Sequence, residues 1–331
     1  MKYLKLFLVL VMLVCIGLFL RATDMQQVAV SLKRVSYNFV WIILVSFCSY
    51  FLGTIAWRFC MGSEGRQLPL LRLFIIRHIG ETTGIVNPAS IVAGEAVKIY
   101  LLRNYAIPRK TVVTSVLVSR VVMILTQVLL FVAAAIYFLY LYHGLPAGFG
   151  GILKLFYVMT GVPLVFIILY RLRTQVKRIA IKNRAGLWLY NRTLKARTQI
   201  SEAQTELSAF FNNNRQYLFL SVVFFILHWV FGSGELWVIL RLLGVKASLM
   251  EAIFVDMSVI LLKSAGAFVP AQIGIEEYGN KIMLAAVGIQ SVAIWLTATI
   301  LRRARQLFWI AFGLVAYFII DRKKVMIQEH A

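Results

Sequence analysis

The sequence predicts an all-α, polytopic helical membrane protein with about seven to nine apolar segments. Two pseudo-repeated halves are expected, each with a broken or re-entrant helix. Hydrophobic residues make up 61% of the chain and charged residues 15%, whereas soluble domains have roughly 45–50% and 25%. The mean hydropathy is +0.82, which excludes a disordered chain and a soluble enzyme. Two apolar stretches are also interrupted by Gly and Pro at matching positions.

The first half, residues 1–170, contains four apolar runs without a Gly/Pro break like that of 69–102, at about 4–20, 38–57, 111–142 and 152–170, the third of which holds Arg120. The first run follows Lys2 and Lys5, as in a signal peptide, but no small-residue cleavage pattern follows it. An uncleaved first span is therefore expected.

A further stretch of the first half, residues 69–102, is apolar but contains charged residues and is broken by Gly and Pro. A continuous lipid-facing helix would not tolerate such a composition. Broken backbone at membrane depth persists only where it is buried in protein or lines a wet cavity. Residues 69–102 are therefore expected to form a discontinuous or re-entrant element.

Residues 171–216 form a strongly basic segment between the halves. By the positive-inside rule this loop is cytoplasmic. It acts either as a topology signal alone or as a surface that attracts anionic lipids.

The second half, residues 217–331, begins with apolar runs at about 217–241 and 249–269. A second broken element is expected at 270–288. The last apolar run, at about 290–320, is interrupted by arginines and fits either one long helix or two short ones.

The two broken stretches share a short pattern. PASIVAGE runs from Pro88 to Glu95, and PAQIGIEE runs from Pro270 to Glu277, so that Pro, Ala, Ile and Glu coincide at the same offsets. Paired Gly/Pro-interrupted segments in corresponding positions of two halves are the best pointer in a sequence to a transport site. The sequence leaves open whether the halves are inverted or parallel.

The repeat extends to two arginines. Arg120 lies 32 residues after Pro88, and Arg302 lies 32 residues after Pro270. The sequence therefore predicts a central site with one acid and one arginine from each half. Arginines there would grip a phosphate head group bidentately, and helix starts freed by the breaks would attract anions. The candidate transport residues are Glu95, Arg120, Glu277, Arg302, Pro88, Gly94, Pro270, Gly274 and Lys98.

Other charged or histidine residues in apolar runs are expected to form structural ion pairs or packing contacts. These are Glu81, Glu235, Asp256, Lys263, His78 and His228.

Several function classes lack their motifs. The sequence has no GxxxxGK[ST] loop for ATP, no HExxH motif and no clustered Cys/His spacing. Cys15, Cys48 and Cys60 lie at unrelated spacings, so neither a disulfide framework nor a metal site is expected. No cofactor is expected. The net charge of +22 lies largely between apolar runs, which favours lipid head groups over nucleic acid.

Three blocks resemble the flippase-like integral membrane family that forms the transmembrane part of lysylphosphatidylglycerol synthases. They are Pro88–Leu102, Phe268–Glu277 and Leu301–Trp309, and the resemblance covers about residues 35–320. Stand-alone relatives include hopanoid-cluster membrane proteins. The chain departs from the family in having Ala93-Gly94 where two glycines are usual. Around Arg120, where many members carry acids, Ser119 and Met123 are neutral.

The resemblance implies movement of lipids across the bilayer of a bacterial inner membrane. The aminoacyl-transfer step of the synthases belongs to a separate soluble domain, for which this sequence has no residues, so no synthase activity is expected. The expected function is a lipid flippase or transporter for an amphiphile with an anionic or modified head group. Two alternatives remain: a membrane-embedded enzyme that modifies lipid head groups, and a non-catalytic partner of an envelope lipid or glycolipid synthesis enzyme. The expected partners are membrane lipids, with a lipid-synthesis enzyme or a second copy left open.

Overall fold

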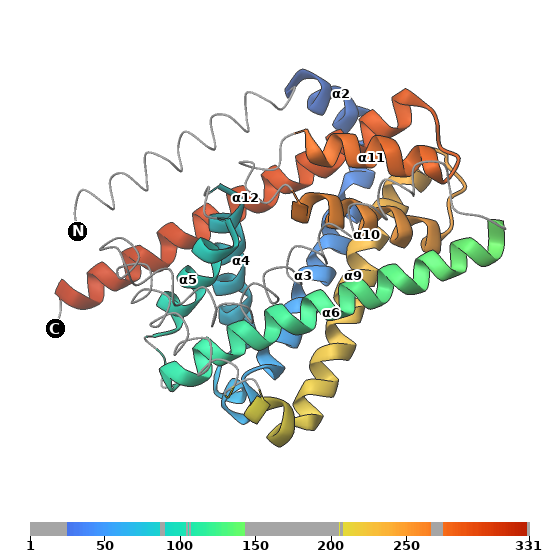
Figure 1. Ribbon diagram of the computed structural model, residues 1–331. Helices are drawn as coiled ribbons and strands as arrows, with labels where there is room; N and C mark the ends of the chain where they lie inside the picture. The colour runs from blue at the N-terminus through green and yellow to red at the C-terminus, as the bar shows by residue number, and fades with distance from the viewer. Residues whose placement is uncertain are drawn as a thin grey trace, which may run out of the picture.

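The computed structural model describes residues 25–86, 90–103, 105, 107–142, 205, 208–265 and 274–329, and every regular element in these ranges is helical (Figure 1). The elements are α2 (Met25–Val35), η1 (Ser36–Asn38), α3 (Phe39–Phe59), η2 (Gly62–Gln67), α4 (Leu70–Val86), α5 (Ser90–Leu102), α6 (Arg109–Tyr142), α9 (Arg215–Leu242), α10 (Leu249–Ala265), α11 (Ile275–Ala286) and α12 (Val292–Glu329). The all-α class is thereby confirmed. The expected spans at 4–20 and 152–170, most of the loop 171–216, and the prolines Pro88 and Pro270 lie outside the described residues.

Three described helices are long and apolar enough to cross a bilayer. Their apolar spans are Ser36–Phe59, Arg109–Phe138 and Arg215–Leu242, close to the runs expected at 38–57, 111–142 and 217–241. The last apolar run of the chain forms a single helix, α12.

Helices α3 and α9 pack along each other in opposite directions. Ile42, near the start of α3, clusters with Ile239 near the end of α9. Farther along α3, the hydroxyl of Ser49 bonds to the carbonyl of His228 (2.8 Å). Beyond the end of α3, Cys60 Sγ lies 3.1 Å from Ser221 Oγ. The two helices are therefore antiparallel.

Helices α4 and α5 form a tight hairpin within residues 69–102, where a discontinuous or re-entrant element was expected. A Cβ atom added to Gly94 would lie 2.5 Å from the carbonyl oxygen of Gly80. Small residues allow such close approach of helix backbones in membranes. Gly94, a candidate transport residue, thus lies at the contact between the two arms.

Helices α10 and α11 form a second hairpin. Gly279 of α11 packs against Val259 and Leu262 of α10, and Lys263 of α10 pairs with Glu276 of α11 (2.7 Å). The broken element was expected at 270–288 with a separate span at 249–269. In the structure, α10 at Leu249–Ala265 is instead the first arm of the hairpin, because its side chains pair with α11.

A helical hairpin followed by a long helix occurs twice, as α4–α5–α6 and as α10–α11–α12. Each set of three helices is one repeat unit. The first hairpin follows the end of α3, and the second follows the end of α9. Because α3 and α9 are antiparallel, the hairpins enter the bundle from opposite ends. Each hairpin packs on the long helix of the other unit: α4 contacts α12, and α10 contacts α6. The described helices are therefore related as an inverted repeat.

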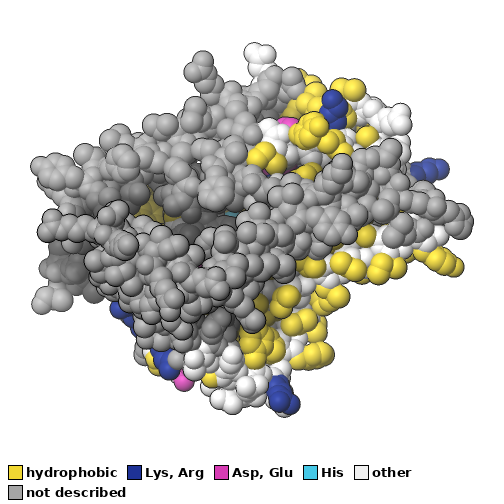
Figure 2. Space-filling model, in the orientation of Figure 1, with side chains coloured by type: hydrophobic (Ala, Val, Ile, Leu, Met, Phe, Trp, Pro, Cys, Tyr) yellow, Lys and Arg dark blue, Asp and Glu magenta, His cyan; other side chains and the backbone are white. Residues whose placement is uncertain are grey.

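Large apolar side chains cover the outer faces of the long helices. Examples are Leu125 and Leu129 of α6 and Phe318 of α12, each more than half exposed. On the described part of the face in Figure 2, hydrophobic side chains fill the lower right and Lys and Arg lie toward the edges. An apolar belt between charged ends suits a helical bundle in a bilayer.

Candidate functional site

Three of the candidate transport residues lie together in a first charge cluster, formed by the first hairpin and α6. Glu95 Oε1 of α5 accepts hydrogen bonds from Lys98 Nζ (3.3 Å) and from Arg120 Nη2 of α6. Lys98 also lies 3.8 Å from Glu81 Oε1, which pairs with Arg77 Nε (3.1 Å). These five residues constitute the first charge cluster.

A narrow crevice lies against the first charge cluster. The cluster residues line it together with Trp57, Ser119, Met123 and Phe225. Its interior volume is about 10 Å³, which is enough for about one water molecule. The structure therefore shows this crevice closed to anything as large as a lipid head group.

A second charge cluster lies among α9, α10, α11 and α12. Arg302 Nη2 donates to Asp256 Oδ1, and Arg302 Nε lies 3.8 Å from Glu235 Oε1 and 4.0 Å from Glu276 Oε1. Arg305 Nε is 3.0 Å from the same Glu235 oxygen. These residues and Lys263, which pairs with Glu276, constitute the second charge cluster.

Glu277 and Arg302, which match Glu95 and Arg120 in the repeat, are not paired. Glu277 accepts a hydrogen bond from the backbone N–H of Gly274 (2.8 Å), which caps the start of α11. Its other oxygen accepts from Arg303. Gly274 itself has a φ of +84°, a conformation that glycine adopts without a side-chain clash. Glu277 and Gly274 therefore shape the start of α11, and Glu276 is the α11 carboxylate that faces Arg302.

The two charge clusters are joined through Tyr50 of α3. Its carbonyl oxygen accepts a hydrogen bond from Arg77 Nη1 (2.8 Å), and its hydroxyl oxygen accepts one from Arg305 Nη1 (2.7 Å). Its ring makes edge contacts with His78 of α4 and Trp309 of α12. The charged groups of both hairpins thus belong to one connected network.

Several members of this network were not among the transport residues predicted from the sequence. Glu81, Glu235, Asp256 and Lys263 form ion pairs, as expected. Arg77, Tyr50, Glu276 and Arg305 were not among the candidates. One signal was present: Arg305 follows Arg302 by three residues, which places both on one face of a helix. Tyr50 contacts α4 and α12, which are distant from it in the sequence. No pattern of residues around position 50 predicts these contacts.

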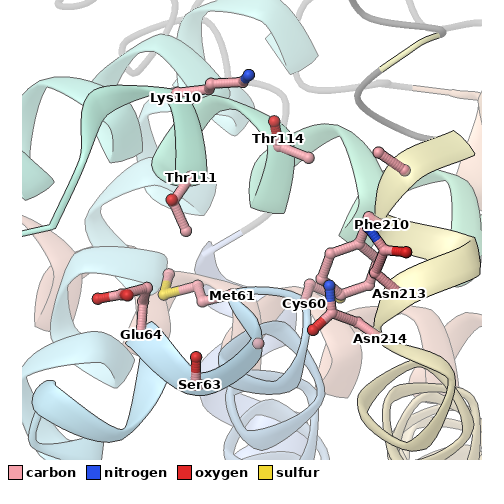
Figure 3. A pocket seen from close by; sticks show the side chains of 12 residues that line it. Cys60, Met61, Ser63, Glu64, Lys110, Thr111, Thr114, Phe210, Asn213 and Asn214 are labelled. Carbon is pink, nitrogen blue, oxygen red and sulfur yellow. The ribbon is translucent and has the colours of Figure 1, made fainter.

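A larger pocket lies at the end of the bundle where α9 begins (Figure 3). Its volume is about 270 Å³, and its lining comes from η2, the start of α6 and residues 209–214. Thr111, Thr114 and Asn214 are among the side chains around it. None of the charge-cluster residues lines it, so it is separate from the network.

No metal centre is apparent within the described ranges, where no three His, Cys, Asp and Glu side chains are grouped to hold an ion.

Comparison with known proteins identifies the family. Residues 4–313 match the family described as the lysylphosphatidylglycerol synthase TM region. No curated protein and no solved structure matches the chain. Because the match covers nearly the whole chain, this membrane protein belongs to the family of lysylphosphatidylglycerol synthase transmembrane regions.

Proposed function

We propose that this chain moves an amphiphile with an anionic or modified head group across the bilayer. It neither changes the lipid chemically nor hydrolyses ATP. The observation that carries this proposal is the inverted pair of hairpins, whose charged side chains form one network through the bundle. Inverted repeats with discontinuous helices around a central polar site are the architecture of many secondary transporters.

The cost of the buried charges supports a functional role. An ionisable side chain at the centre of a membrane helix costs about 2.5–3.5 kcal/mol on insertion scales. The chain carries several, and Arg302, Glu235 and Asp256 are each less than one-tenth exposed. Arginine guanidinium groups bind phosphate in a fork geometry. In the proposed mechanism the head group passes along the network, while the acyl chains stay in lipid beside the apolar outer faces.

The distribution of basic residues supports an orientation. Described Lys and Arg residues gather at the end of the bundle where α3 ends and α6 and α9 begin: Arg58, Arg66, Arg72, Arg103, Arg109, Lys110 and Arg215. In the sequence, the basic segment 171–216 ends where α9 begins, at Arg215. By the positive-inside rule we assign this end to the cytoplasm, and we place the protein in a bacterial inner membrane.

The test uses purified protein in liposomes that contain phosphatidylglycerol with a chemically quenchable fluorophore. An impermeant quencher added outside bleaches the outer leaflet, so a flippase makes the inner-leaflet signal decay as well. The proposal expects faster loss of protected signal than in protein-free liposomes, with the lipid mass unchanged. A product of altered mass would instead establish an enzyme. Without relocation of phosphatidylglycerol or of source-membrane lipids, the proposal fails and the partner function remains.

A further inference from the structure

The first charge cluster contains more cations than carboxylates. Among the described residues, its three cations face two carboxylates, Glu81 and Glu95. In the second charge cluster, together with the pair Arg303–Glu277, four cations face four carboxylates. The crevice beside Arg120 therefore lies in a field with one unbalanced positive charge.

Two buried donors at the same crevice also lack a partner. Trp57 Nε1 and Arg120 Nε are buried and make no hydrogen bond within the part of the chain that the structure describes. Trp229 and Trp237, by contrast, donate to the carbonyl oxygens of Met123 and Ala247 (both 3.1 Å). A buried donor left unpaired costs about 1–3 kcal/mol. Both unpaired donors belong to side chains that line the crevice.

Glu95 already fills the place of an anion at this crevice. One of its carboxylate oxygens accepts hydrogen bonds from both Lys98 and Arg120. Lys98 Nζ also lies 5.6 Å from the centre of the Trp57 ring. Because the closed crevice has room for little beyond one water molecule, an oxoanion can enter only if the Glu95 carboxylate moves aside.

The geometry points to a binding site for a phosphate monoanion at Arg120, Lys98 and Trp57, with Glu95 as its built-in competitor. The inference rests on the proposed function and names the part of the head group that this site takes: a phosphodiester, as in an anionic phospholipid. Arg120 and Lys98 exchange the Glu95 carboxylate for the phosphodiester, and Trp57 Nε1 and Arg120 Nε gain the acceptor that they lack. Return of Glu95 to its two cations then releases the head group.

The first test measures binding to the purified full chain in detergent by calorimetry. The probes are short-chain phosphatidylglycerol, the matching neutral diacylglycerol and inorganic phosphate. Wild type is expected to bind phosphatidylglycerol and not diacylglycerol. Trp57→Phe removes one donor and is expected to weaken this binding about tenfold, the effect of one hydrogen bond to a charged group. Trp237→Phe, which removes a donor with a partner, is the matched control and is expected to bind as wild type does.

Glu95→Gln is a second, independent variant in the same assay. It removes the competing charge and keeps an acceptor for Arg120, so phosphatidylglycerol is expected to bind about tenfold tighter. The control is Glu64→Gln, since Glu64 accepts a hydrogen bond from the Gln67 side chain within η2 and does not line the crevice. Equal or weaker binding by Glu95→Gln overturns the competitor role, and unchanged binding by a folded Trp57→Phe overturns the site. Inorganic phosphate that binds as tightly as the lipid overturns the assignment to a head group.

Binding and relocation are measured separately. Binding that follows these expectations without relocation in liposomes supports the site and overturns transport. Relocation at the wild-type rate in Trp57→Phe and Glu95→Gln supports transport and overturns this site.

Discussion

The hydroxyl oxygen of Tyr50 lies 2.7 Å from Nη1 of Arg305. The same tyrosine accepts a hydrogen bond from Arg77 through its carbonyl oxygen. One residue of α3 thereby holds an arginine from each repeat, one on the first hairpin and one on the long helix after the second. Tyr50 is therefore a direct physical link between the two repeats.

Tyr50→Phe tests this connection. The substitution keeps the carbonyl contact to Arg77 and the ring contacts to His78 and Trp309, but it removes the hydrogen bond to Arg305. A hydrogen bond to a charged group contributes about 1.5–3 kcal/mol, so we expect a folded protein with a lower melting temperature and a roughly tenfold slower relocation. Tyr278→Phe, at an exposed tyrosine of α11, is the control. Relocation at the wild-type rate in Tyr50→Phe would show that the two clusters act independently.

Gly53→Ala tests the position of Arg77. A Cβ atom at Gly53 would lie 2.7 Å from Arg77 Cζ, so the guanidinium must leave its place between Tyr50 and Glu81. We expect a loss of about 1–3 kcal/mol of stability, because a buried charge loses its hydrogen bonds. At Gly234 a Cβ atom would meet its nearest neighbour at 3.8 Å, so Gly234→Ala is expected to be neutral or stabilising by up to about 1 kcal/mol. Thermal unfolding in detergent measures both variants, and equal melting temperatures would contradict the Arg77 contact.

Opposite entry of the two hairpins can be tested by labelling. Ser63, in η2 before the first hairpin, and Ser291, between the second hairpin and α12, are both exposed. In a background with the three native cysteines replaced, we expect Ser63→Cys and Ser291→Cys to react with an impermeant maleimide from opposite sides of the membrane. By the proposed orientation, Ser63→Cys reacts from the cytoplasm. Labelling of both from one side would contradict the inverted arrangement.

The sequence was sufficient to predict the helical class, the three long spans and an interruption within residues 69–102, but not the hairpin that α4 and α5 form there. The apolar composition predicts a helical membrane protein, and a long apolar run is typical of a spanning helix. The first arm of the second hairpin, α10, was harder to predict. Leu249–Ala265 is as apolar as a spanning helix, and only its pairing with α11, as between Lys263 and Glu276, marks it as a hairpin arm.

The repeat predicted the pair Glu95–Arg120 and failed for the pair Glu277–Arg302. Side chains at adjacent helix positions point about 100° apart, so the rotation of α11 about its axis decides whether Glu276 or Glu277 faces the second charge cluster, and the rotation of α12 decides the same for Arg302 and Arg303. The number of residues between two positions does not determine how each helix is rotated about its own axis. Asp256 and Tyr50 make contacts between segments that are far apart in the chain. The spacing of residues within one segment does not predict such contacts.

The most direct test of the account compares relocation of fluorescent phosphatidylglycerol by Arg120→Ala and Arg109→Ala. Both arginines lie on α6, but Arg120 joins the first charge cluster whereas Arg109 is exposed in the first turn. Arg302 is less suitable, because its removal leaves buried carboxylates unpaired, which costs about 3–5 kcal/mol. In Arg120→Ala, Glu95 keeps Lys98, so folding is expected to survive. We predict relocation at least about tenfold slower in Arg120→Ala and unchanged in Arg109→Ala. Equal rates in a folded Arg120→Ala would contradict passage of the head group through the charge network.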